Sequence, residues 1–173
     1  MHTIELVSPN HCQKELPELA RLLLACVKEG ASVGFVEPFS LDDSLLFWQK
    51  NVLPSVTSGA LRLLIAKVDN QVAGCVYLDI GMMPNQVHRA SIGKLLVDPH
   101  HRAKGIAKAL MLEIEQQASN CNRSLLVLDT KTGDIAEQLY LSLGYEIAGC
   151  IPHFAKDPVG SNLASTTYMY KKL

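Results

Sequence analysis

The stretch LLVDPHHRAKGIAKAL, residues 95–110, is the most informative part of this chain. Its first three residues are apolar and predict a buried strand, and its last residues predict the first turns of an amphipathic helix. A turn with the pattern Arg-x-x-Gly-x-Ala joins the two, at the point where the helix must begin. A helix N-terminus presents free backbone amides and the positive end of the helix dipole, so this turn favours phosphate groups. The stretch therefore predicts a site for a phosphorylated ligand at a strand–helix junction.

Composition and charge indicate one globular domain. The chain has 173 residues, of which 48% are hydrophobic and 19% charged, and its formal net charge is −1. This length predicts a single domain over residues 1–173. The charge balance argues against nucleic acid as a partner, and the apolar runs are too short to cross a membrane. The N-terminus has no signal-peptide pattern, so we expect a cytoplasmic protein.

The cysteines and histidines do not form a metal-binding or disulfide pattern. Five cysteines stand at positions 12, 26, 75, 121 and 150. Their number is odd and no pair has Cys-x-x-Cys spacing, so the pattern favours reduced, mostly buried thiols. The adjacent pair His100 and His101 is expected in a solvated loop, because neighbouring residues rarely bind one metal together. We therefore expect no metal.

Apolar periodicity predicts the order of the secondary structure. Strands are expected over residues 3–8, 61–68, 71–80, 88–97, 124–128, 145–150 and 166–172, and helices over 10–29, 40–49, 106–118 and 135–143. Asn10 is the expected N-cap of the first helix and Gly30 its stop, while Pro17 either lies near its first turn or splits it. Residues 40–43 have the form of a capping box. The order predicts an α/β (α+β) fold, with a mixed central sheet of about seven strands and helices on both faces.

The basic turn after residue 97 has two interpretations on its own. Its small residues allow the backbone amides to approach a pyrophosphate closely, and its basic residues add positive charge. The small residues are Ala103, Gly105 and Ala107, and the basic ones are Arg102, Lys104 and Lys108. The pattern is neither a Walker P-loop nor a dinucleotide fingerprint. A plain helix start, with small residues chosen for packing, is the other interpretation.

A second motif downstream resolves this choice. The first motif runs from Val97-Asp98-Pro99 through Arg102 and Gly105 to Leu110, and the second is Ala136-x-x-Leu139-Tyr140-x-x-x-Gly144-Tyr145. Together, and in this order, they resemble motifs A and B of the GCN5-related N-acetyltransferases, the GNAT superfamily. The resemblance is strong over residues 60–150. Residues 30–35, 128–130 and 149–155 are similar to the tabtoxin-resistance-type acetyltransferases of that superfamily.

The resemblance implies acetyl-CoA as cosubstrate, bound where two parallel central strands separate. By motif position, the main chain of Leu95, Leu96 and Val97 would pair with the pantetheine arm, and one of these amides would polarise the acetyl carbonyl. The pyrophosphate would lie beside Arg102, against the amides of Ala103, Lys104, Gly105, Ile106, Ala107 and Lys108. The family often has glycine where Ala103 stands, and usually asparagine where Gly133 stands. A cofactor contact from that asparagine is therefore lost here or supplied elsewhere.

Two residues are candidates for proton transfer. Tyr140 matches the general acid of the family, which would protonate the departing CoA thiolate; a packing tyrosine is the other interpretation. Asp129 is expected at the end of a strand, where α/β sites form. It would take the amine proton, directly or through water, or hold a cationic substrate; a loop or helix-capping residue is its other interpretation. Tyr77 and Asp79 are weaker candidates.

The acceptor pocket is expected to be small and apolar. It would be formed by Ser32, Val33, Gly34 and Phe35, with Phe154 opposite. His153 is expected in a surface loop, and Lys94 is expected to be exposed. A small amine fits such a pocket better than a protein tail does.

These features predict an N-acetyltransferase. It would move the acetyl group of acetyl-CoA to a primary amine of a small molecule by direct attack, the molecule being a toxin, an antibiotic or an amino-acid-like metabolite. One alternative is a protein N-terminal acetyltransferase, against which the apolar segment 30–35 argues. Another is a non-catalytic acyl-CoA-binding sensor, against which the presence of Tyr140 argues. A monomer or a homodimer is expected.

Overall fold

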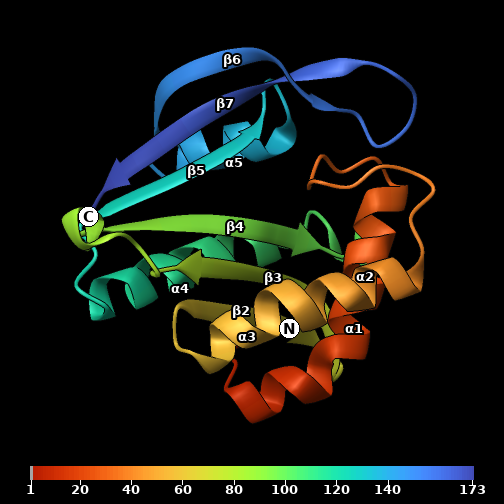
Figure 1. Ribbon diagram of the computed structural model, residues 1–173, viewed down its shortest axis with the longest axis horizontal. Coiled ribbons are helices and arrows are strands. Elements are labelled where there is room, and N and C mark those ends of the chain that lie inside the picture. The colour runs from red at the N-terminus through yellow and green to blue at the C-terminus, as the bar shows by residue number, and fades with distance from the viewer. Residues whose placement is uncertain (1) are drawn as a thin grey trace.

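The computed structural model describes residues 2–173 and contains one seven-stranded sheet (Figure 1). Its order is β1-β2-β3-β4-β5-β7-β6. The strands are β1 (Thr3–Leu6), β2 (Leu61–Val68), β3 (Gln71–Asp79), β4 (Arg89–Val97), β5 (Leu125–Lys131), β6 (Glu146–Lys156) and β7 (Leu163–Lys172). All neighbouring strands are antiparallel except β4 and β5, which are parallel. The predicted mixed sheet is confirmed.

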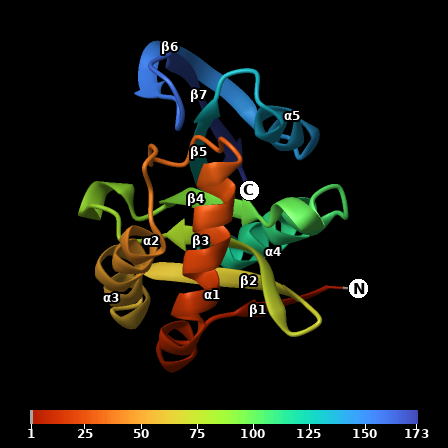
Figure 2. The same cartoon turned by 90° about the vertical axis from the view of Figure 1, so that its right-hand side faces the viewer.

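Helices cover both faces of the sheet, as predicted (Figure 2). They are α1 (Pro9–Lys28), α2 (Leu41–Phe47), α3 (Leu53–Thr57), α4 (Ile106–Asn120) and α5 (Ile135–Ser142), and a π-helical turn over Trp48–Val52 joins α2 to α3. Two core clusters result. Leu63 and Ile65 of β2 pack with α1, α2 and α3, while Leu64 and Ala66 pack with α4. A sheet that is buried on both faces requires such apolar residues at successive positions.

The helix starts are set by capping side chains. Ser8, rather than the predicted Asn10, is the N-cap of α1, because its side chain accepts a hydrogen bond from the His11 amide at 3.4 Å. Pro9 then occupies the first turn, where its fixed φ fits and its missing N–H is not needed. Pro17 lies inside α1 without splitting it. The predicted capping box between Ser40 and Asp43 is present at the start of α2.

The strands after α4 are longer than their apolar runs. Asp129 was expected at the end of a strand, but β5 continues to Lys131 because β7 pairs with it along its whole length. β6 likewise extends through His153, which was expected in a loop and has a φ of +53° at an irregularity in its pairing with β7. Pairing between strands, which apolar patterning does not report, therefore sets these ends.

The cysteines are free thiols, as their spacing predicted. All five cysteines are free, and Cys12, Cys26 and Cys75 are buried. Within residues 2–173, no group of three or more His, Cys, Asp or Glu is arranged to hold a metal ion. Over the same residues, no helix has the length and hydropathy needed to cross a membrane.

Candidate active site

The two parallel strands separate at the centre of the sheet. β4 and β5 are paired only from Arg89↔Leu125 to Ser91↔Val127, and they then diverge (Figure 1). From Ile92 to Val97, β4 has no partner strand on this edge among the residues that the structure describes. Backbone amides and carbonyls on such an edge are available to a ligand. The separation forms one side of a cleft of about 800 Å³.

A bulge in β4 accompanies the separation. The register with β3 shifts between Cys75 and Tyr77, and Lys94 at this point has a φ of +50°. Bulges bend a strand and increase its twist, and this one lies in the part of β4 that is not paired with β5. The preceding position, 93, requires a glycine, because a Cβ there would lie 2.6 Å from the Tyr77 ring.

The turn between β4 and α4 leaves its backbone amides open to the cleft. Gly105 is the N-cap of α4, with a φ of +79° and no side-chain cap, and a Cβ at this position would meet nothing within 4 Å. The first intrahelical bond runs from the Ala109 amide to the Gly105 carbonyl at 3.0 Å. The amides of Ile106, Ala107 and Lys108 therefore have no partner within the helix. Such a set of amides is suited to phosphate oxygens.

Most residues of the predicted cofactor segment line the cleft. They are Leu95, Leu96, Val97, Arg102, Ala103, Gly105, Ile106, Ala107 and Lys108. Lys104 is not among them, because its ammonium turns back and donates to the His100 carbonyl at 3.0 Å. Ala103 adopts a φ of +59°, a conformation that glycine takes without strain, in agreement with its position in the motif.

Tyr140 reaches the cleft from α5. Its ring packs on that of Tyr145 at 5.8 Å between centroids, and it is buried. Asp134 caps α5, and the buried Glu137 accepts hydrogen bonds from the Gly133 amide at 3.0 Å and the Thr167 hydroxyl at 2.9 Å. These contacts fix the helix on β7. Burial, followed by the charges of Asp129 and Asp134, raises the pKa of Tyr140 well above its ordinary value, so the phenol keeps its proton at neutral pH.

Asp129 lines the same cleft from β5. The Thr166 hydroxyl lies 3.2 Å from its Oδ2 and 2.9 Å from the Thr130 carbonyl oxygen. The charge of Asp129 contributes to raising the pKa of both Tyr140 and Tyr77. Tyr77 also lines the cleft, whereas Asp79 does not, because its carboxylate accepts from the Gly81 amide at 2.9 Å.

The segment after α1, where the acceptor end was predicted, lines one part of the cleft. Ser32, Val33 and Gly34 line it, and Phe154 lines it from β6. Phe35 lies outside this lining and instead packs on Phe39 and Phe47, with ring centroids 4.6 and 5.2 Å away.

Lys94 is a candidate site residue that was not predicted from the sequence. It is half-buried rather than exposed, and it lines the cleft. Its ammonium donates to the Val33 carbonyl and lies 4.9 Å from the Phe35 ring centroid. A lysine inside an otherwise apolar strand was the available signal, but the direction of its side chain depends on the bulge.

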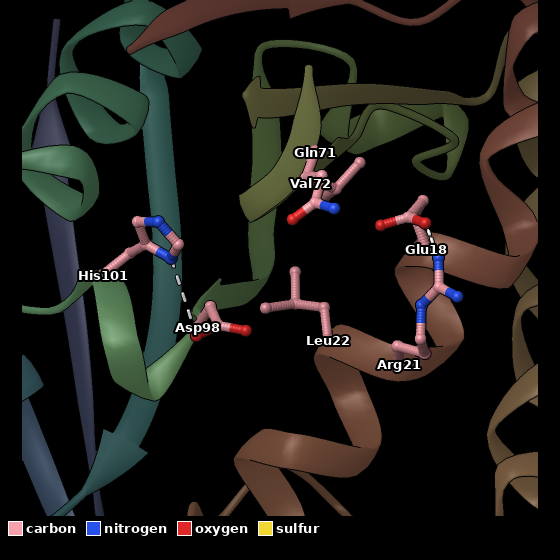
Figure 3. A pocket seen from close by; sticks show the side chains of 7 residues that line it. All are labelled: Glu18, Arg21, Leu22, Gln71, Val72, Asp98 and His101. Carbon is pink, nitrogen blue, oxygen red and sulfur yellow. Dashed lines mark ion pairs between the residues drawn. The ribbon is translucent and has the colours of Figure 1, made fainter. Parts of the chain in front are cut away.

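A smaller hollow of about 330 Å³ lies between α1, the start of β3 and the β4–α4 turn (Figure 3). Its charged groups pair with one another, Glu18 with Arg21 and Asp98 with His101, the latter at 3.6 Å (Figure 3). The chemistry-bearing side chains Tyr140 and Asp129 lie in the larger cleft. The larger cleft is therefore the candidate active site.

Comparison with known sequences identifies the family that the chain resembles. The model of the acetyltransferase (GNAT) family matches residues 24–145. Among curated proteins, the L-amino acid N-acetyltransferase AaaT of Escherichia coli (strain K12) is 31% identical over 91 residues, which are 51% of this chain and 56% of that protein. The match thus spans little more than half the length of this curated relative.

Comparison with solved structures shows a shared fold. A ribosomal-protein-alanine N-acetyltransferase from Brucella melitensis has a TM-score of 0.81 at 18% identity, with 99% of each chain covered. The structure of yncA from Salmonella typhimurium with its cofactor acetyl-CoA has a TM-score of 0.76 at 16% identity, with 99% of this chain and 94% of that chain covered.

Proposed function

Because the chain belongs to the acetyltransferase (GNAT) family, we propose that it transfers the acetyl group of acetyl-CoA to the primary amine of a small molecule. One observation carries the proposal. The buried side chain of Tyr140, an unpaired strand edge and a set of free helix amides line the same cleft. These are a proton donor, a binding edge for an extended amide-bearing arm and a site for phosphate groups.

The cleft fits acetyl-CoA, which supplies an activated acetyl thioester when bound. The open edge of β4 at Leu95–Val97 would hold the pantetheine arm through main-chain hydrogen bonds. The amides that begin α4 would hold the pyrophosphate, with Arg102 and Lys108 adding positive charge beside it. The space where a Cβ of Gly105 would stand is empty and allows a phosphate to come close.

Tyr140 and Asp129 would divide the proton transfers. The Tyr140 hydroxyl holds its proton at neutral pH, because burial raises its pKa, and would deliver it to the departing sulfur. The Asp129 carboxylate would take the proton of the acceptor amine, directly or through water. Both side chains line one cleft, which would hold the thioester and the acceptor amine together.

The acceptor is proposed to be a small molecule, with amino-acid-like amines first among the candidates. Ser32, Val33 and Gly34 line the cleft from the segment after α1 and Phe154 lines it from β6, and these small or apolar side chains suit a small amine. The partial similarity to an L-amino acid N-acetyltransferase favours the same substrate class.

The test is acetyl-CoA-dependent thiol release over a panel of amines. The panel contains L-amino acids, polyamines, aminoglycosides and short peptides with a free N-terminus, and acetyl-CoA binding is measured separately by calorimetry. We expect binding of acetyl-CoA and turnover with a small amine. Turnover with peptides alone would favour an N-terminal acetyltransferase, and binding without turnover on any amine would favour a sensor. Absence of acetyl-CoA binding would refute the proposal altogether.

Replacement of Asp129 by Asn is expected to lower kcat/KM for the amine about 100-fold, the usual effect of losing a general base. The amide keeps the shape of the carboxylate but cannot accept the amine proton. Calorimetry should show unchanged acetyl-CoA binding. Asp69→Asn makes the same charge change in the exposed β2–β3 turn and should leave turnover unchanged. A turnover equal to that of the parent for Asp129→Asn would remove Asp129 from the base role.

A further inference from the structure

Lys94 is the one half-buried lysine without a carboxylate partner among residues 2–173. The other half-buried lysines are Lys67, Lys131 and Lys171, which lie 2.6 Å from Glu15, 2.6 Å from Asp157 and 2.7 Å from Glu115, respectively. A buried charge is costly unless it is paired and hydrogen-bonded. Lys94 therefore departs from the pattern that the rest of the chain follows.

The surroundings of Lys94 hold its ammonium in place without neutralising it. Its Nζ donates to the Val33 carbonyl and lies 4.9 and 5.0 Å from the ring centroids of Phe35 and Phe47. An ammonium has three donors, and within the described residues only the bond to Val33 is made by this one. Because the Lys94 side chain lines the cleft, its other two N–H donors are available to a ligand there.

The carboxylate of Asp129 lines the same cleft but forms no ion pair with Lys94 among the described residues. Asp129 lies close enough for its charge to act on Lys94, although burial dominates and lowers the pKa of Lys94 to about 8. The cleft thus presents an ammonium from β4 and a carboxylate from β5, on the two strands that diverge. A ligand with one charge of each sign complements this pair.

We infer that Lys94 is the anion-binding residue of the acceptor site, and that the acceptor is an aminocarboxylate whose carboxylate bonds to the Lys94 ammonium while its amine faces Asp129. This inference rests on the proposed acetyl transfer and specifies its substrate class. The carboxylate of the acceptor would be the ion-pair partner that Lys94 lacks within the described residues. The hydrogen bond to the Val33 carbonyl holds the Lys94 ammonium beside the segment proposed to bind the acceptor.

The test compares L-amino acids with their C-terminal amides, which keep the amine and the side chain but lack the negative charge. We expect the parent protein to acetylate the acids with a higher kcat/KM than the amides. Lys94→Met should raise the KM of the acids about 10- to 100-fold, the usual effect of losing a charge-assisted hydrogen bond. The same change should leave the KM of the amides and of acetyl-CoA within about threefold. Lys50→Met, at an exposed lysine, is the matched control.

The outcomes separate this inference from the proposed function. If Lys94 only supported the segment after α1, Lys94→Met would affect acids and amides equally, and the inference would be wrong. Parent turnover with amines that lack a carboxylate, and not with acids, would also overturn it while preserving acetyl transfer. If no amine is acetylated, calorimetric titration of the acids and amides onto protein saturated with CoA still decides it. Preferential binding of the acids, lost in Lys94→Met, supports the inference, and equal binding refutes it.

Discussion

Replacement of Tyr140 by phenylalanine is expected to lower kcat by about 100- to 1,000-fold, the range for loss of a positioned general acid. The ring of phenylalanine retains the packing on Tyr145 at 5.8 Å between centroids, so α5 should stay in place. The acetyl-CoA dissociation constant should therefore stay within about twofold of the parent value. Steady-state thiol release gives kcat, and calorimetry gives the dissociation constant.

The environment of Tyr140 gives the reason for this large effect. Burial and two nearby carboxylates raise its pKa above the ordinary value. The phenol is consequently protonated throughout the neutral range, and its ionisation should not limit the rate below that ordinary value of about 10. If kcat falls as the pH is raised and does so below about pH 10, the group that ionises is not Tyr140.

Tyr145→Phe is the matched control for Tyr140→Phe. It removes a hydroxyl from the neighbouring buried ring, which does not line the cleft, and kcat should stay within about threefold. Equal losses in the two variants would mean that the effect is one of packing. Unchanged kcat in Tyr140→Phe would exclude Tyr140 as the acid, and a solvent proton would then have to serve.

Much of the fold could be predicted from the periodicity of apolar residues and from the turn and capping residues between them. Residues 61–68 form a strand with the predicted limits, because their apolar pattern is bounded by turn residues on both sides. The capping box of Ser40 and Asp43 is a purely local arrangement, and it was predicted for the same reason. The ends of β5 and β6 were predicted wrongly, because they depend on pairing with β7, a partner distant in the sequence.

The candidate site shows the same division between local and long-range information. The amides at the start of α4 follow from a local turn, so the motif located them. Phe35 belongs to a motif-like apolar segment, yet its ring packs on Phe39 and Phe47 outside the cleft lining. The position of Lys94 depends on a bulge relative to β3. A slip of one residue reverses the face on which a side chain lies, so the direction of Lys94 toward the cleft could not be predicted from the sequence.

Replacement of Gly105 by glutamate is expected to weaken acetyl-CoA binding about 100-fold, the effect of losing hydrogen bonds to a charged group. Gly105 is the N-cap of α4 and borders the amides assigned to the pyrophosphate. A glutamate side chain there would place negative charge at the position proposed for phosphate, where the helix dipole favours an anion. It would thus compete with the ligand for the same donors. Calorimetric titration with acetyl-CoA measures the loss directly.

Backbone strain has to be separated from this charge effect, because Gly105 has a φ of +79° that glutamate adopts at a cost. Gly160→Glu supplies the control: Gly160 has a φ of +85°, also has nothing within 4 Å of a Cβ, and does not line the cleft. Both variants therefore carry similar strain and the same added charge. We expect similar losses of thermal stability in the two, and loss of acetyl-CoA binding in Gly105→Glu alone. Equal acetyl-CoA affinity in both variants would mean that the pyrophosphate does not bind at the start of α4.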